Sequence, residues 1–152
     1  MRAVQEVIKS RESNTLWTLS PDNTVFEALH ILAQEDVGAL MVIEHGKLVG
    51  IFSERDYTRK IALAGKASKD TLVKEIMTSK VMTVSPKTDV RECMALMASN
   101  KFRHLPVVEG GTVMGIISMR DIMHDIISGH EETISQLQNY ICLLYTSDAA
   151  DD

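Results

Sequence analysis

Hydrophobic and polar positions follow the same order twice along this chain, at a period of sixty-five residues. Residues 18–61 align without a gap on residues 83–126, and sixteen of these forty-four pairs are identical. A tandem repeat at a fixed period indicates two copies of one supersecondary unit, which bury their apolar faces against each other. We therefore expect a functional site at the junction of the copies to come as a related pair.

Each copy predicts the same series of elements. Apolar residues recur at helical spacing over one segment; two short apolar runs then flank a tight polar turn, and a second amphipathic stretch follows. The helices are predicted at 25–33, 57–63, 90–98 and 122–127, and the paired strands at 39–44, 48–53, 105–109 and 113–118. A Ser-Pro turn signal precedes the first helix of each copy and separates it from a further short strand. The sequence thus predicts an α+β fold of two tandem β-α-β-β-α repeats packed about a pseudo-two-fold axis.

The repeats also set the expected domain limits. The first repeat is assigned to residues 1–66, the second to residues 67–129, and residues 130–152 form a C-terminal tail. The tail has no periodicity that continues the fold, so we expect it to be partly non-native sequence.

Charge and composition narrow the function classes. The formal net charge is −5, yet all 16 Lys and Arg residues lie before residue 130, together with 16 of the 21 acidic residues. The repeated part is therefore neutral, without the basic stripe of a nucleic-acid or anionic-membrane binder. Its apolar runs have strand length, and the N-terminus does not resemble a signal peptide, so we expect a cytoplasmic protein. Two cysteines without a CxxC pair and scattered histidines predict no metal site.

The motif with chemical content is Gly50-Ile-Phe-Ser-Glu-Arg-Asp56, repeated as Gly115-Ile-Ile-Ser-Met-Arg-Asp121. A glycine in a strand permits close approach of a ligand or backbone. A carboxylate at the start of the next helix can accept two hydrogen bonds from neighbouring hydroxyls, such as a ribose 2′,3′-diol. The alternative is purely structural, because Ser-x-x-Asp is also a capping-box variant, and a duplication preserves caps as readily as ligands.

Residues 4–127, about four fifths of the chain, resemble a pair of cystathionine β-synthase (CBS) domains, also called a Bateman module. The resemblance rests on the tandem β-α-β-β-α units, the duplicated Gly-h-h-Ser-x-x-Asp junction (h, hydrophobic) and Arg103-His-Leu-Pro-Val107. The run Phe52-Ser-Glu-Arg-Asp-Tyr57 is similar to stand-alone CBS-pair proteins.

This resemblance implies that clefts between the repeats bind an adenosine-containing ligand: AMP, ADP, ATP, NAD or S-adenosylmethionine. It implies that Asp56 and Asp121 hold the ribose and that Ser53 and Ser118 lie near ribose or phosphate. The other residues implied are Thr18, Val37, Gly38, Ala39, Leu40, Gly50, Arg55, Thr83, Phe102, Arg103, His104, Leu105, Pro106, Gly115 and Arg120.

The two implied clefts are not equivalent. Arg103 and His104 occupy the positions that are Gly38 and Ala39 in the first repeat. In related modules, the phosphate of a nucleotide held by one repeat is often met by basic residues of the other. We therefore expect Arg103 and His104 to serve the ligand held by Asp56; the alternative is an exposed Arg103 and a partly buried, satisfied His104.

The interpretation that follows is a regulatory, non-enzymatic module. It would sense adenine nucleotides as a homodimer and signal to a regulated partner protein, with no catalytic cofactor, nucleic acid or membrane involved. Two alternatives remain: a regulatory fragment of a larger enzyme or transporter, and a dimerisation module that binds no ligand.

Overall fold

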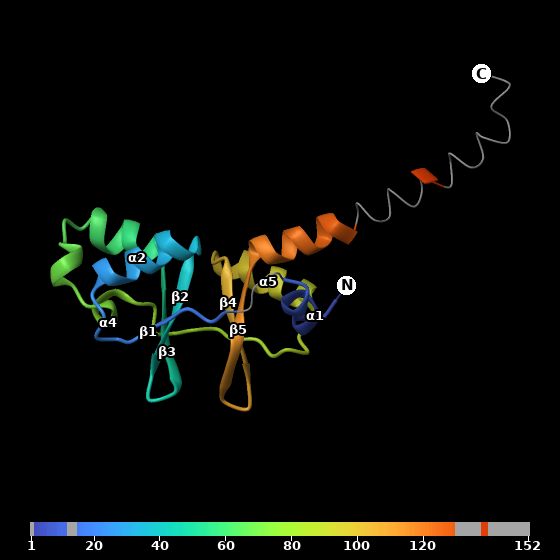
Figure 1. Cartoon of the computed structure of the whole chain (residues 1–152), viewed down its shortest axis with the longest axis horizontal. Coiled ribbons are helices and arrows are strands. Elements are labelled where there is room, and N and C mark those ends of the chain that lie inside the picture. Colours follow the sequence, from blue (N-terminus) through green and yellow to red (C-terminus); the bar gives the residue numbers. More distant parts are fainter. Residues whose placement is uncertain (1, 12–14, 130–137, 140–152) are drawn as a thin grey trace, which may run out of the picture.

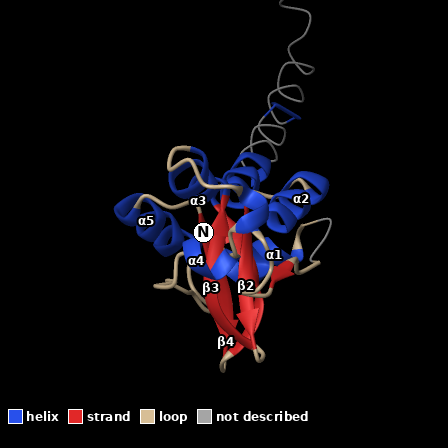
Figure 2. Ribbon diagram, turned by 90° about the vertical axis from the view of Figure 1, so that its left-hand side faces the viewer, coloured by secondary structure: helices blue, strands red, loops and turns tan. Residues whose placement is uncertain are grey.

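The computed structural model describes residues 2–11, 15–129 and 138–139 of the 152-residue chain. Two β-hairpins stand side by side, with their turns at one end and helices gathered at the other (Figure 1). In the perpendicular view the strands run from the helices down to the turns (Figure 2). This mixture of helices and strands confirms the expected α+β fold.

The first repeat follows the predicted order. Its elements are β1 (Thr18–Leu19), α2 (Val25–Glu35), β2 (Ala39–Glu44), β3 (Lys47–Ser53), α3 (Glu54–Tyr57) and a π-helical turn, η1 (Thr58–Ala62). β1 runs parallel to β2, and β2 is antiparallel to β3. The Thr24 side chain begins α2 by accepting the Glu27 N–H at 3.1 Å, while the Glu27 carboxylate accepts the Thr24 N–H at 3.1 Å. This arrangement is a capping box.

The second repeat departs from the first at its beginning. Its elements are α5 (Val90–Asn100), β4 (His104–Glu109), β5 (Thr112–Ser118) and a helix over residues 119–129. At the N-terminus of α5, the Asp89 carboxylate accepts the Arg91 N–H at 2.7 Å instead of forming a capping box with Glu92. The same carboxylate also contacts the Arg91 guanidinium, with both oxygens at 3.2 Å.

The short strand predicted before α5 is reduced to one bridge, between Val84 and Val107. In the first repeat, Thr18 pairs with Met41, whose equivalent in the second repeat is Pro106. The Pro106 carbonyl still accepts the Val84 N–H at 3.0 Å, but proline has no N–H to donate in return. The prediction of a short strand before α5 was therefore wrong, because Pro106 cannot donate the backbone hydrogen bond that would extend the pairing.

The short helices α1 (Val4–Lys9) and α4 (Val73–Ile76) complete the opposite repeats. Val4 and Val7 lie in the hydrophobic core of the second repeat, whereas Val73 and Ile76 lie in that of the first. The Val4 N–H donates to the Thr88 carbonyl at 2.8 Å. The N-terminal segment thus packs on the second repeat, and the segment linking the repeats, which also holds η2 (Ser68–Asp70), packs on the first.

Candidate ligand-binding site

Asp56 lies directly after β3 and is almost fully enclosed by hydrogen-bonding groups. Its Oδ2 accepts the Ser53 N–H at 3.0 Å and the Ser53 hydroxyl at 3.1 Å, and Ser53 Oγ accepts the Asp56 N–H at 3.2 Å. Its Oδ1 accepts the Thr78 hydroxyl at 3.2 Å and lies 3.2 Å from Lys60 Nζ. The Asp56 side chain is 11% exposed.

Asp121 occupies the equivalent position after β5 with fewer partners. Its Oδ2 accepts the Ser118 N–H at 2.8 Å and the Arg11 guanidinium at 3.0 Å. Ser118 Oγ accepts the Asp121 N–H at 3.1 Å. Within the part of the chain that the structure describes, Oδ1 accepts no hydrogen bond. The Asp121 side chain is 21% exposed.

Both carboxylates therefore cap their helices, as the structural interpretation of the motif requires. Capping uses the backbone amide of the serine and one carboxylate oxygen, and a carboxylate has about four lone-pair positions. A cap and a ligand contact are thus compatible in one side chain wherever the second oxygen is accessible.

The two repeats meet beside these junctions. Ala39 pairs with Ser53 and His104 pairs with Ser118, so the starts of β2 and β4 lie next to the strand ends that carry the motif. The His104 imidazole packs on Gly38, where a Cβ atom would lie 3.2 Å from the ring. Across the same junction, the Arg55 guanidinium donates to the Lys101 carbonyl.

His104 is partly buried at this contact. Burial lowers the pKa of the His104 imidazole below its ordinary value; the Asp121 carboxylate partly opposes this shift, and Arg103 adds to it. His104 pairs with Ser118 in the strand register, so it lies on the same hairpin end as Asp121, the carboxylate of its own repeat.

The motif glycines are covered by the chain itself. A Cβ on Gly50 would lie 2.5 Å from Met77 Sδ and 3.1 Å from the Thr78 carbonyl. Ile51 and Thr78 exchange backbone hydrogen bonds of 3.0 and 2.9 Å, so the linking segment runs directly against β3. The closest atom to a Cβ on Gly115 is Ile8 Cδ1, at 3.7 Å. At Gly50 the close approach is therefore made by the Met77 side chain and by the Thr78 backbone.

The remaining predicted site residues divide by exposure. Thr18, Arg55, Thr83, Arg103 and Arg120 are exposed, and Val37 and Phe102 are half-buried. The side chains of Ala39, Leu40, Leu105 and Pro106 are buried, and Leu40 and Leu105 belong to the two hydrophobic cores. These two leucines therefore contribute to packing.

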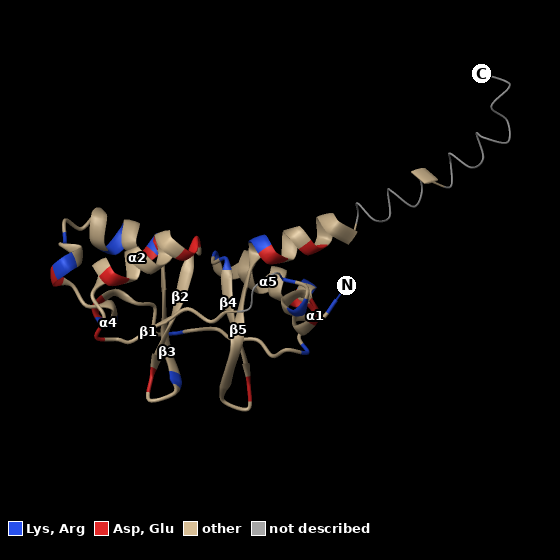
Figure 3. Cartoon of the chain, in the orientation of Figure 1, with Lys and Arg blue, Asp and Glu red and all other residues tan. Residues whose placement is uncertain are grey.

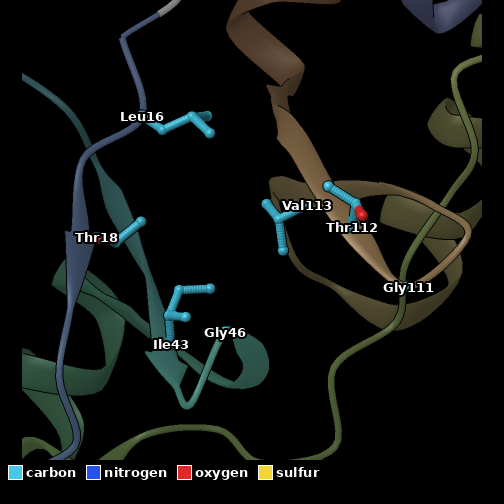
Figure 4. Close-up of a pocket in the computed structure, with 7 residues that line it drawn as sticks. All are labelled: Leu16, Thr18, Ile43, Gly46, Gly111, Thr112 and Val113. Carbon is cyan, nitrogen blue, oxygen red and sulfur yellow. The ribbon is translucent and has the colours of Figure 1, made fainter.

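A separate hollow of about 390 Å³ lies between the turn ends of the hairpins (Figure 4). It is lined by Leu16, Thr18, Ile43, Gly46, Gly111, Thr112 and Val113. Among the predicted site residues it includes Thr18 alone. The strand register places Asp56 and Asp121 at the opposite end of the hairpins from Gly46 and Gly111. The hollow and the two carboxylates are therefore different places.

The predicted site residues do not include three that contact the carboxylates: Lys60, Thr78 and Arg11. Thr78 and Arg11 lie outside the gapless repeat of residues 18–61 and 83–126, so the repeat pattern does not mark them.

Other chemistry is not assembled in the described part of the chain. No group of three or more His, Cys, Asp or Glu side chains is placed there to hold a metal ion. Burial raises the pKa of the Cys93 thiol to about 11. Acidic and basic residues are intermixed over both repeats (Figure 3). No helix among these residues combines the length and hydropathy needed to span a membrane.

Comparisons with known proteins agree with the fold. The chain is 40% identical over 138 residues to the Arabidopsis thaliana CBS domain-containing protein CBSX3, named as mitochondrial, covering 88% of this chain and 66% of that protein. A CBS-domain protein from Burkholderia ambifaria has a similar structure, with a TM-score of 0.80, 39% identity and coverage of 83% of this chain and 94% of that one. A hexameric CBS-CP12 protein from bloom-forming cyanobacteria has a TM-score of 0.71 at 29% identity, covering 81% and 70%. None of the three is named as an enzyme.

The family comparison matches both halves of the repeat. The model of the CBS domain fits residues 6–63 and again residues 73–128. These ranges contain both Ser-x-x-Asp junctions and the hairpins that carry them. The chain therefore belongs to the family of CBS-domain proteins, with two CBS domains in tandem.

Proposed function

We propose that this chain is a regulatory CBS-pair module that binds an adenosine-containing ligand, such as AMP, ADP, ATP or NAD, and signals its occupancy to a partner protein. The supporting observation is the pair of Asp56 and Asp121 carboxylates, which serine caps hold at equivalent strand-to-helix junctions. A ribose diol offers two hydroxyl donors, and a carboxylate held in a fixed position is the matching acceptor. The role proposed for these carboxylates is ligand binding, without catalysis.

The contacts between the repeats give the ligand a way to act. Gly38 touches His104, and Arg55 bonds the Lys101 carbonyl, so the first strand-to-helix junction is tied to the second repeat. A ligand that prefers one arrangement of these contacts shifts the population toward it, by no more than its difference in affinity. The regulated partner would read that arrangement.

Homodimerisation belongs to the same proposal. Leu63, Met123 and Ile127 are 79%, 54% and 52% exposed, at or beyond the second helix of each repeat. Apolar side chains on these helices suit a second copy, and closed two-fold pairing is the commonest symmetric assembly. The hexameric cyanobacterial neighbour supports self-association of this fold. A mass that stays monomeric at high concentration in light scattering would contradict the dimer.

A ligand-free structural module is the second candidate. It is favoured by Asp56, whose two oxygens already have four partners inside the chain. On this hypothesis the junctions serve only as helix caps.

Thermal unfolding with and without nucleotide separates the two candidates. A ligand at about a hundred times its dissociation constant stabilises the folded state by about 2.7 kcal/mol, so AMP or a related compound is expected to raise the Tm. The exposed Asp22→Ala variant is the control and is expected to show the same shift, while the Asp56→Ala/Asp121→Ala double variant shows none. Absence of a shift with AMP, ADP, ATP and NAD in the unmodified protein would favour the structural module.

A further inference from the structure

The two carboxylates differ in how many acceptor positions they have left. Asp56 receives four contacts: two from Ser53 on Oδ2, and one each from Thr78 and Lys60 on Oδ1. Asp121 receives two, from Ser118 and Arg11, both on Oδ2. Because a carboxylate offers about four lone-pair positions, Asp56 is saturated and Asp121 keeps one oxygen available among the described residues.

From this difference we infer that the two ligand sites are unequal, with Asp121 ready to accept a ribose diol and Asp56 held closed by Lys60 and Thr78. This inference rests on the proposed nucleotide function and specifies which site fills first. A diol can bond Oδ1 of Asp121 without breaking a contact to any of the described residues. At Asp56 it must first displace the Thr78 hydroxyl or the Lys60 ammonium.

Lys60 and Thr78, which occupy Oδ1 of Asp56, also contact other parts of the first repeat and the linking segment. Lys60 lies one turn after Asp56, and its ammonium also donates to the Ile76 carbonyl at 2.9 Å, at the end of α4. Thr78 follows α4 in the segment that joins the repeats and pairs with Ile51 on β3. Displacing either group removes one contact between Asp56 and groups that also hold the linking segment, whereas binding at Asp121 leaves these contacts in place.

The cations are also arranged differently at the two sites. Arg11 lies beside Asp121, and its guanidinium bonds the Ile116 carbonyl at 2.8 Å. Bound at Asp121, a nucleotide phosphate has this guanidinium nearby. This order of filling is the reverse of the one expected from Arg103 and His104 acting across the repeats on a ligand at Asp56.

Calorimetric titration with AMP tests the inference, because the inference predicts variants that bind AMP more tightly at the weaker site. The unmodified protein is expected to show one tighter and one weaker site, and Asp121→Ala removes the tighter one while Asp56→Ala leaves it. Lys60→Met and Thr78→Val each remove a competing bond from Asp56 and are expected to tighten the weaker site by about twofold to tenfold. The exposed neighbour Arg59→Met is the matched control, with no change expected. Thr78→Val, which keeps the side-chain shape, decides the matter if Lys60→Met lowers stability through the lost Ile76 contact.

Two results overturn the inference. One is loss of the tighter site in Asp56→Ala with its retention in Asp121→Ala. The other is an unchanged or weakened second site in both Lys60→Met and Thr78→Val. Either result leaves nucleotide binding itself intact, whereas absence of AMP binding in the unmodified protein refutes the proposed function together with this inference.

Discussion

Lys60 and Asp125 occupy the same position in the two repeats and carry opposite charges. In the first repeat, Lys60 lies four residues after Asp56 on the same helical segment and pairs with it at 3.2 Å. In the second, Asp125 takes that place, and cations come from the N-terminal segment: Arg2 contacts Asp125 at 2.7 Å and Arg11 contacts Asp121 at 3.0 Å. The N-terminal segment is thus fixed to the second repeat by ion pairs on both sides of α1.

These two arginines are expected to contribute unequally to stability. Arg2 is 45% exposed, and exposed ion pairs contribute about 0–1 kcal/mol. The Arg11 side chain is 22% exposed and also bonds the Ile116 carbonyl, and a hydrogen bond to a charged group contributes about 1.5–3 kcal/mol. Urea unfolding is expected to show the larger loss in Arg11→Ala. A loss in Arg2→Ala that equals or exceeds it would contradict this account.

Substitution of the motif glycines is expected to affect only the first repeat. A Cβ on Gly50 would collide with Met77 and approach the Thr78 backbone, whereas a Cβ on Gly115 makes ordinary contact at 3.7 Å. Overpacking of this kind costs about 1–3 kcal/mol, so Gly50→Ala is expected to lower the free energy of unfolding by that amount. Gly115→Ala is the matched control, with a small change. Equal losses in chemical denaturation would show that the linking segment does not pack on Gly50 in solution.

Because α1 packs on the second repeat, we expect a mutation of a buried residue in α1 to destabilise the second repeat more than the first. Val4 is fully buried, yet its neighbours are residues of the second repeat. Val4→Ala is expected to lower stability by about 1.5–3 kcal/mol, from lost apolar burial and the cavity left behind. Amide exchange is expected to accelerate in β4 and β5 more than in β2 and β3. Gln5→Ala, exposed on the same helix, is the control and leaves exchange unchanged.

Stability is expected to fall in mild acid through His104. Its pKa in the folded protein lies below the ordinary value of 6.5. As pH falls through 6.5, the unfolded chain therefore binds a proton that the folded protein does not, and the free energy of unfolding decreases; above that pH the group has no effect. Urea unfolding on both sides of this pH is expected to show a smaller decrease in His104→Gln. His45→Gln, with a 92% exposed side chain, serves as control, and identical pH profiles for all proteins would remove His104 as the cause.

The periodic pattern predicted most of the helices and strands, because burial of apolar faces determines them locally. It failed where one residue changes a backbone hydrogen bond, as Pro106 does opposite Thr83. The site was predicted as far as Asp56, Asp121 and their serines, which lie within one short motif. Arg11 and Thr78 were missed because they reach the carboxylates by long-range packing, which follows from the helix exchange and leaves no local pattern.

A final prediction concerns the ribose 2′ position. A 2′-phosphate adds negative charge beside a carboxylate and removes a hydroxyl donor, so NAD is expected to bind at least about tenfold more tightly than NADP. At the Asp121 site, Arg11 is expected to oppose this preference for NAD once the carboxylate is removed. In Asp121→Asn the Arg11 guanidinium loses its carboxylate partner but keeps its bond to the Ile116 carbonyl, and it then lies where it can meet a 2′-phosphate. Calorimetry is expected to show that Asp121→Asn narrows or inverts the preference for NAD, and that the Asp121→Asn/Arg11→Ala double variant narrows it less. Equal binding of NAD and NADP by the unmodified protein would exclude the carboxylates as ribose ligands.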